Sequence, residues 1–155
     1  MRLFLLILQL KILHAGYVSK FPLVSRLKSA SQKEIPLSMR RINEIFYSLQ
    51  GEGYHTGIPA VFVRFSGCNL RCPFCDTQHE EGTLMSDEDI AMEVAKYSTQ
   101  VVILTGGEPG LWIDEKLVDA LHHERKYVCI ETNGTCRLPE NIDWVTCSPK
   151  EGAKI

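Results

Sequence analysis

The chain has 155 residues, 45% of them hydrophobic and 23% charged, which is enough for one domain with a substantial core. Residues 1–38 carry six Lys or Arg and one acidic residue, Glu34, whereas residues 39–155 carry 11 Lys or Arg and 18 Asp or Glu. The acidic main body argues against nonspecific binding to nucleic acid, because such binding depends on neutralising phosphate charge.

The first 38 residues do not share the pattern of the rest of the chain. They begin MRLFLLILQLKILHAG, in which a basic start precedes an apolar run and small residues, as in a secretory signal peptide. The apolar run 3–8 is too short to span a bilayer, which takes about 20 residues. Residues 1–38 are therefore a non-conforming extension, either a targeting or anchor segment or sequence ahead of a true start at Met39. We expect residues 39–155 to form the functional domain.

Strands and helices are expected to alternate along residues 40–155. Runs rich in β-branched and aromatic residues predict strands at 42–49, 60–65, 101–104, 127–130 and 144–147. Apolar residues at helical spacing predict helices at 86–97 and 114–124, the first with Ser86 as its N-cap and Asp89 three residues later. Alternation of this kind implies an α/β fold with a mostly parallel sheet. No clear helix follows the last strand, so we expect an incomplete (βα) barrel that lacks its C-terminal part.

Polar and glycine-rich segments follow three of the predicted strands. They are Thr105–Pro109, Glu131–Gly134 and Ser148–Lys150. The carboxyl ends of the strands carry the active site in barrel-like α/β folds. We therefore expect these three segments to meet at one site.

Three cysteines, Cys68, Cys72 and Cys75, lie within eight residues in the spacing C-x3-C-x2-C. Three thiolates on one short loop suit a metal ion or an iron–sulfur cluster better than disulfides. A cubane cluster has four irons, so three cysteines leave one iron open to a small molecule. The same loop with His79 also fits a structural Cys3His zinc site, and the spacing alone leaves both readings open.

Two further cysteines, Cys129 and Cys147, lie in apolar strand-like runs. Thiols in such runs usually pack as small apolar side chains. This use of cysteine indicates a reducing cytoplasm rather than an oxidising compartment.

The segment GCNLRCPFC at 67–75 resembles the signature loop of the radical S-adenosylmethionine (radical SAM) enzymes. TGGEP at 105–109 resembles the glycine motif of the same superfamily and follows the next strand, as that superfamily requires. Within the superfamily, the order of motifs over residues 40–155 resembles the 7-carboxy-7-deazaguanine synthase family. The further motifs are NEIFYSLQGEG at 43–53, CDT at 75–77, ETNG at 131–134 and SPK at 148–150.

The resemblance implies a [4Fe–4S] cluster held by Cys68, Cys72 and Cys75, with SAM on the open iron. It implies radical conversion of 6-carboxy-5,6,7,8-tetrahydropterin to 7-carboxy-7-deazaguanine with loss of ammonia. It also implies Mg²⁺ bound through the Thr77 hydroxyl, with Asp76 as a weaker candidate. The residues expected at SAM are Phe74, Gly106, Gly107, Glu108, Asn133, Ser148 and Lys150. Those expected at the substrate are Gln50, Gly51, Glu52, Arg64 and Thr105.

The same resemblance implies a cytoplasmic homodimer that uses an electron donor such as flavodoxin, with no nucleic-acid or membrane partner. Family members normally continue past the point that corresponds to Ile155, with a further strand and further substrate contacts. Two alternatives stay open: another radical SAM protein, such as a glycyl-radical activase, and a noncatalytic zinc module that uses His79. Gln50 and Glu52 distinguish the activase from the pterin enzyme, because an activase needs no pterin-binding residues.

Overall fold

The structure is a computed structural model that describes residues 39–154. The predicted N-terminal extension, residues 1–38, lies outside the described residues, as does Ile155. Within residues 39–154, no helix is long and apolar enough to cross a membrane.

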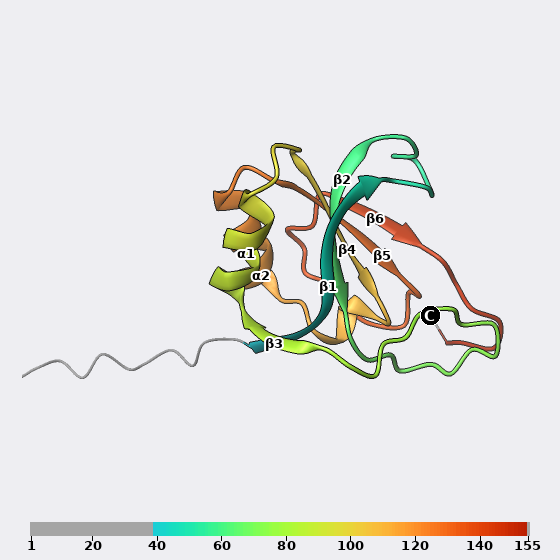
Figure 1. Ribbon diagram of the computed structural model, residues 1–155. Helices are drawn as coiled ribbons and strands as arrows, with labels where there is room; N and C mark the ends of the chain where they lie inside the picture. The colour runs from blue at the N-terminus through green and yellow to red at the C-terminus, as the bar shows by residue number, and fades with distance from the viewer. Residues whose placement is uncertain (1–38, 155) are drawn as a thin grey trace, which may run out of the picture. The chain divides into compact units, whose positions relative to one another are not determined.

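Six strands form one sheet in the order β3-β1-β2-β4-β5-β6, and both α-helices lie on one face of it (Figure 1). The strands β2, β4, β5 and β6 pair in parallel, whereas β1 pairs antiparallel with β2 and with β3. The strands are Met39–Leu49 (β1), Pro59–Phe65 (β2), Thr83–Ser86 (β3), Val101–Gly106 (β4), Tyr127–Thr132 (β5) and Trp144–Cys147 (β6). The helices are Asp87–Ala95 (α1), the short 3-10 helix Pro109–Leu111 (η1) and Glu115–His123 (α2).

The parallel part of the sheet confirms the alternation of strands and helices that the sequence predicts. Two features were not predicted: the antiparallel pairing of β1 with its neighbours, and the strand β3 itself. The prediction missed β3 because this strand has only four residues and two of them are exposed. It therefore shows neither the length nor the alternation by which a strand is recognised.

The first predicted helix begins directly after its predicted cap, Ser86, and the second begins at Glu115, one residue after its predicted start. The Ser86 side chain accepts a hydrogen bond from the Asp89 backbone and the Asp89 side chain accepts one from Ser86, which completes a capping box at α1. Asp114 caps α2 in the same way, through the backbone N–H of Leu117. Leu117, Val118 and Leu121 of α2 are fully buried, and Ile90 and Val94 of α1 belong to the same core. Tyr97 packs against this core just beyond the end of α1 at Ala95.

Side chains alternate between the two faces of β2 and so divide its residues between core and site. Val61, Val63 and Phe65 belong to the main core, together with buried residues of α1 and α2. Phe62 lies on the other face, and Arg64 follows it there by the two-residue period of a strand. Arg64 therefore lies on the face of β2 that points away from the helix-covered core.

The two cysteines of the apolar runs differ in their packing. Cys129 on β5 is buried, as predicted, and burial raises the pKa of its thiol to about 12, with smaller contributions from nearby carboxylates. Cys147 is exposed, so the prediction that it packs as an apolar side chain is wrong. The reason is that β6 is the last strand of the sheet within residues 39–154 and alternates between half-buried and exposed positions.

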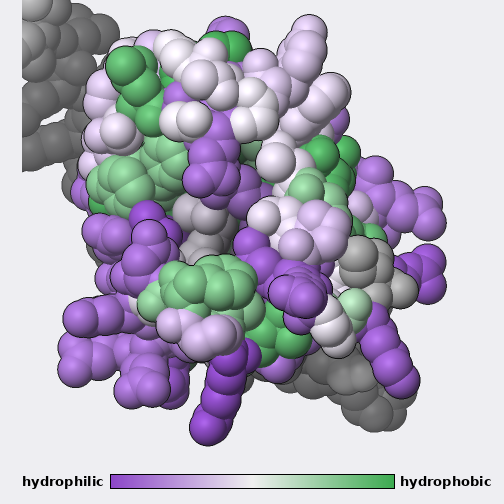
Figure 2. All heavy atoms as spheres, turned by 90° about the vertical axis from the view of Figure 1, so that its right-hand side faces the viewer, coloured by the Kyte–Doolittle hydropathy of each residue, from purple (hydrophilic) through white to green (hydrophobic). Residues whose placement is uncertain are grey.

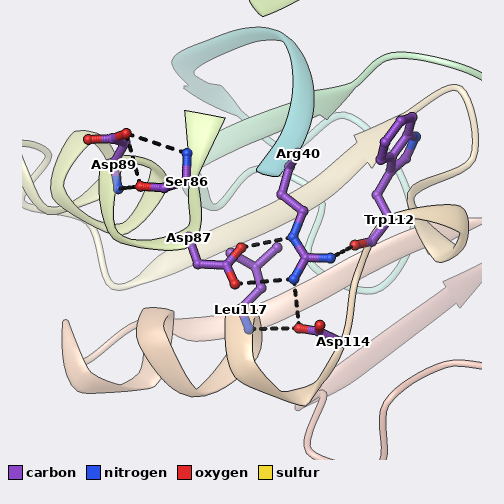
Figure 3. A network of polar contacts seen from close by, with 7 residues as sticks. All are labelled: Arg40, Ser86, Asp87, Asp89, Trp112, Asp114 and Leu117. Carbon is purple, nitrogen blue, oxygen red and sulfur yellow. Dashed lines mark hydrogen bonds and ion pairs between the residues drawn. The ribbon is translucent and has the colours of Figure 1, made fainter. Parts of the chain in front are cut away.

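One buried arginine connects the first strand to both helix starts (Figure 3). Arg40 on β1 donates from Nε to Asp87 at 2.8 Å, at the first residue of α1. Its Nη2 donates to Asp114, the N-cap of α2, also at 2.8 Å. Its Nη1 donates to the backbone oxygen of Trp112, just after η1. These bonds fix the segment that leads out of the glycine motif.

Candidate active site

A cavity of about 590 Å³ opens at the carboxyl ends of β2, β4, β5 and β6. All three polar segments that follow the predicted strands contribute to its wall, as the sequence predicts, and the cysteine loop contributes too. Figure 2 shows the side of the molecule that carries this loop, where strongly hydrophilic side chains gather around a few apolar ones. Of the predicted site residues, the wall contains Gln50, Gly51, Glu52, Arg64, Cys68, Cys72, Phe74, Cys75, Thr77, Thr105, Gly106, Gly107, Asn133, Ser148 and Lys150.

The three clustered cysteines border two cavities. Besides the first, they line a second cavity of about 600 Å³. The loop between them is irregular, with one backbone bond of 3.1 Å from the Cys75 N–H to the Cys72 oxygen. The base of the loop is better fixed, because the Gly67 N–H donates to the His79 oxygen at 2.7 Å. None of the three thiols forms a disulfide; Cys68 and Cys72 are half-buried and Cys75 is exposed.

The thiol positions bear on which metal group the loop suits. Within residues 39–154, no three His, Cys, Asp or Glu side chains converge closely enough to hold one ion. A zinc site needs all its ligands at about 2.0–2.3 Å from one centre. In a cubane, each cysteine binds a different iron, and the three cysteines line cavities of about 590 and 600 Å³ in which such a group would lie.

The two glycines of the TGGEP motif lie against the base of the cysteine loop. A Cβ on Gly106 would stand 2.2 Å from the Phe65 oxygen, and one on Gly107 would stand 2.1 Å from the Gly67 oxygen. Gly106 also has φ +124, a conformation that other residues rarely adopt. The Glu108 N–H donates to the Gly67 oxygen at 2.9 Å. Only glycine lets these two loops approach so closely.

Glu108 lies behind the cavity wall rather than in it. Its side chain is fully buried. One carboxylate oxygen accepts from Gly110 N–H at 2.9 Å and from the Thr132 hydroxyl at 2.7 Å, and the other accepts from Asn133 N–H at 2.7 Å. The carboxylate therefore joins the glycine motif to the end of β5, and the expected contact of Glu108 with SAM would come from its backbone oxygen.

Glu131 is a cavity residue that the sequence-based reasoning did not select. One of its carboxylate oxygens accepts from Gln50 Nε2 at 2.8 Å, and the other accepts from the Thr105 hydroxyl at 2.7 Å. Gln50 in turn accepts from the Glu52 N–H at 3.1 Å. The signal was present, because Glu131 opens the ETNG motif and shares the face of β5 with Cys129, opposite the core residue Ile130.

Arg64 is held at the edge of the cavity by two contacts. Its Nε donates to Glu44 at 2.7 Å, and its guanidinium lies 5.6 Å from the centroid of the Phe46 ring. A side pocket of about 380 Å³ brings Arg64 next to Asp76 and Thr77. The arginine therefore stands beside the residues expected to bind Mg²⁺.

The cavity-lining residues that are expected at SAM differ in their burial and in their hydrogen bonds. Asn133 is buried, and its side chain bonds to Asn69 at 3.1 Å and to the Thr135 N–H at 2.9 Å. Lys150 Nζ donates to the Ser148 hydroxyl at 2.7 Å. Phe74 is 70% exposed, so its ring is available to cover a planar ligand.

Comparison with known proteins gives a consistent set of similarities. A family profile described as the Radical SAM superfamily matches residues 62–148. The chain is 74% identical over 117 residues to a 7-carboxy-7-deazaguanine synthase of Bacteroides thetaiotaomicron, covering 76% of this chain and 64% of that protein. It is 43% identical over 140 residues to one of Nitratidesulfovibrio vulgaris, covering 74% of this chain and 65% of that protein.

A solved structure shares the fold. It is the crystal structure of QueE from Escherichia coli, which matches with a TM-score of 0.69 and 32% identity over 80% of this chain and 67% of that one. The chain spans 64% and 65% of the lengths of the two curated relatives.

Proposed function

The chain belongs to the radical SAM superfamily, and we propose that it converts 6-carboxy-5,6,7,8-tetrahydropterin to 7-carboxy-7-deazaguanine by radical ring contraction with loss of ammonia. The observation that carries the proposal is the shared cavity, since one wall brings together the cysteine loop, the glycine motif and the Gln50–Glu52 turn. The 74% identity to a protein named for this product supports it.

Cys68, Cys72 and Cys75 would hold a [4Fe–4S] cluster in the space that they border. When bound, the cluster would supply the electron for reductive cleavage of SAM, which is the source of the radical that the reaction of the pterin needs. The chain itself would bind and orient the partners around that reaction. The short approach between Gly107 and Gly67 sets the cysteine loop against the glycine motif.

SAM would lie along the edge formed by Gly106, Gly107 and the ends of β5 and β6. Backbone oxygens of the glycine motif can accept from its ammonium group. Asn133, Ser148 and Lys150 offer amide, hydroxyl and ammonium groups on the same wall, which suit the ribose and carboxylate. Phe74 would cover the adenine.

The pterin would bind where Gln50, Glu52 and Thr105 meet. The amide of Gln50 and the hydroxyl of Thr105 are oriented by Glu131, so their remaining hydrogen-bonding groups have fixed directions. Arg64 would bind the substrate carboxylate, for which a planar guanidinium offers two parallel donors. Thr77, with Asp76 beside it, would hold Mg²⁺ next to that carboxylate, because Mg²⁺ takes few protein ligands and completes its shell with substrate oxygens and water.

Further elements of the proposal concern partners. The exposed position of Cys75 supports transfer of an electron from a soluble carrier of the flavodoxin type. Exposed Tyr47, Leu49 and Tyr54 at the β1–β2 hairpin support contact between two copies of the chain. A reducing cytoplasm suits the free thiols.

Anaerobic reconstitution of the full chain with iron and sulfide tests the first part of this proposal. We expect about four irons per chain and an EPR signal of the reduced protein that changes when SAM is added. His79→Ala should leave that signal in place. Stoichiometric zinc that is lost in His79→Ala, with no SAM-sensitive signal, would instead establish the zinc module. SAM cleavage that survives Gln50→Ala, with no pterin turnover in the wild type, would establish an activase.

A further inference from the structure

Arg64, the residue proposed to bind the substrate carboxylate, pairs with a carboxylate of the chain itself. Its Nε donates to Glu44 on β1 at 2.7 Å, and its terminal nitrogens Nη1 and Nη2 make no hydrogen bond with any of residues 39–154. A carboxylate that binds an arginine end-on takes one bond from each of these terminal nitrogens. Glu44 therefore occupies the one nitrogen that such a ligand does not need.

An irregularity in β1 places Glu44 opposite this arginine. In the pairing of β1 with β2, Ile42 lies opposite Phe65. The register then shifts, so that Glu44 rather than Asn43 lies opposite Arg64. Such β-bulges are common next to active sites, where they re-aim a side chain, and directly opposite residues of an antiparallel pair lie on the same face. The backbone itself thus brings the Glu44 carboxylate to the guanidinium.

The residue at the bulge holds the neighbouring loop. Asn43 Nδ2 donates to the backbone oxygens of Gln78 at 3.0 Å and of Glu81 at 3.2 Å. Gln78 directly follows Thr77, the residue expected to bind Mg²⁺. The side pocket of about 380 Å³ is lined by Asn43, Glu44, Arg64, Asp76, Thr77 and Gln78. One bulge in β1 therefore contacts both the arginine and the loop that face this pocket.

The ring of Phe46 restricts the guanidinium further. Cζ of Arg64 stands 5.6 Å from the ring centroid, within the range of about 6 Å for a cation–π contact. The ring stacks on Phe62 at 5.0 Å between centroids, and both rings line the first cavity. Because Glu44 and Phe46 already restrain the arginine, less side-chain freedom is left for it to lose when a ligand binds.

We propose that Glu44 is a positioning residue for recognition of the substrate carboxylate: it fixes Arg64 through Nε and leaves the two terminal nitrogens free for a carboxylated pterin. The inference rests on the proposed function, in which Arg64 binds that carboxylate, and adds a residue that strengthens the preference for pterins that carry one. Two carboxylates at one arginine repel each other, and Mg²⁺ at Thr77 would offset that repulsion.

The ion pair can be removed without disturbing the fold. The side chain of Glu44 is 50% exposed and that of Arg64 is 25% exposed, and exposed ion pairs add little to stability. The matched control is Glu93→Ala, which removes the exposed ion pair with Lys96 at the end of α1. Glu93 borders none of the cavities described above.

The test measures dissociation constants by anaerobic titration calorimetry of the reconstituted full chain, with SAM present and no reductant. The ligands are 6-carboxy-5,6,7,8-tetrahydropterin and the same tetrahydropterin without its 6-carboxyl group. We expect Glu44→Ala to raise the Kd of the first about three- to tenfold, as when one long side chain must be immobilised on binding, and to leave the Kd of the second unchanged. Glu44→Gln, whose amide oxygen still accepts from Nε, and Glu93→Ala should bind both ligands like the wild type.

The outcomes separate this inference from the proposed function. A Glu44→Ala protein that binds the carboxylated pterin like the wild type, or loses affinity equally for both ligands, overturns the inference and leaves the function intact. An effect of Glu44→Ala that persists in an Arg64→Gln background also overturns it, because Glu44 would then act without Arg64. A wild-type protein that binds neither pterin, or an Arg64→Gln protein that keeps the wild-type preference for the carboxylated one, overturns the proposed carboxylate site and this inference together.

Discussion

Replacing Glu108 with glutamine tests whether this residue positions the glycine motif or contacts SAM directly. The carboxylate is fully buried and accepts three hydrogen bonds of 2.7–2.9 Å, from Gly110, Thr132 and Asn133. The glutamine amide turns one accepting oxygen into a donor, which then faces another donor. A hydrogen bond to a charged group contributes about 1.5–3 kcal/mol. The loss of at least one such bond should lower the free energy of unfolding by about 2–4 kcal/mol.

Urea unfolding of the cluster-free protein, followed by circular dichroism, measures this change. Glu124→Gln is the matched control, because Glu124 is exposed and caps α2 only through its backbone; its free energy of unfolding should change by less than about 0.5 kcal/mol. If Glu108→Gln unfolds at the wild-type urea concentration and loses only SAM affinity, the positioning role is refuted. The carboxylate would then act as a direct ligand.

Three further changes have effects that follow from the structure. Gly107→Ala should lower the free energy of unfolding by at least about 1–3 kcal/mol and reduce bound iron, because the added Cβ would stand 2.1 Å from the Gly67 backbone oxygen. Gly51→Ala is the control: its Cβ would meet nothing within 4 Å, so this variant should unfold like the wild type. Burial would raise the pKa of Asp114, but the hydrogen bond and charge of Arg40 lower this pKa below its ordinary value. The wild type should therefore have a higher free energy of unfolding than Asp114→Asn near neutral pH. Unfolding curves measured at decreasing pH should show this difference disappear as the pH falls through the lowered pKa. Cys129, with a pKa of about 12, should be the slowest of the six cysteines to react with iodoacetamide at pH 8, as followed by mass spectrometry; equal rates would contradict its burial.

Much of the fold follows from local patterns in the sequence. Capping residues fix where α1 and α2 begin, and the period of two along β2 separates the core residues from Arg64. The meeting of distant motifs at one cavity was also predictable, because parallel strands end at a common edge. These inferences depend only on neighbours in sequence or on a general property of parallel sheets.

Other features depend on contacts that no local pattern reveals. The inward turn of Glu108 requires donors from a segment more than 20 residues away, at Thr132 and Asn133. The place of Glu131 in the cavity depends on Gln50, which lies 81 residues from it in the chain. The strand β3 pairs with residues 39–42 of β1, on the edge of β1 opposite to β2. A carboxylate in a motif therefore predicts a functional segment more reliably than it predicts the direction of its side chain.

Product formation tests the central claim most directly. The reconstituted full chain would be incubated anaerobically with SAM, a reductant and 6-carboxy-5,6,7,8-tetrahydropterin, and the products would be separated by liquid chromatography with mass detection. We predict 7-carboxy-7-deazaguanine, formed by the wild type and absent when Cys75 is replaced by alanine. A wild-type protein that holds its cluster and cleaves SAM but leaves the pterin unchanged would contradict the proposed reaction.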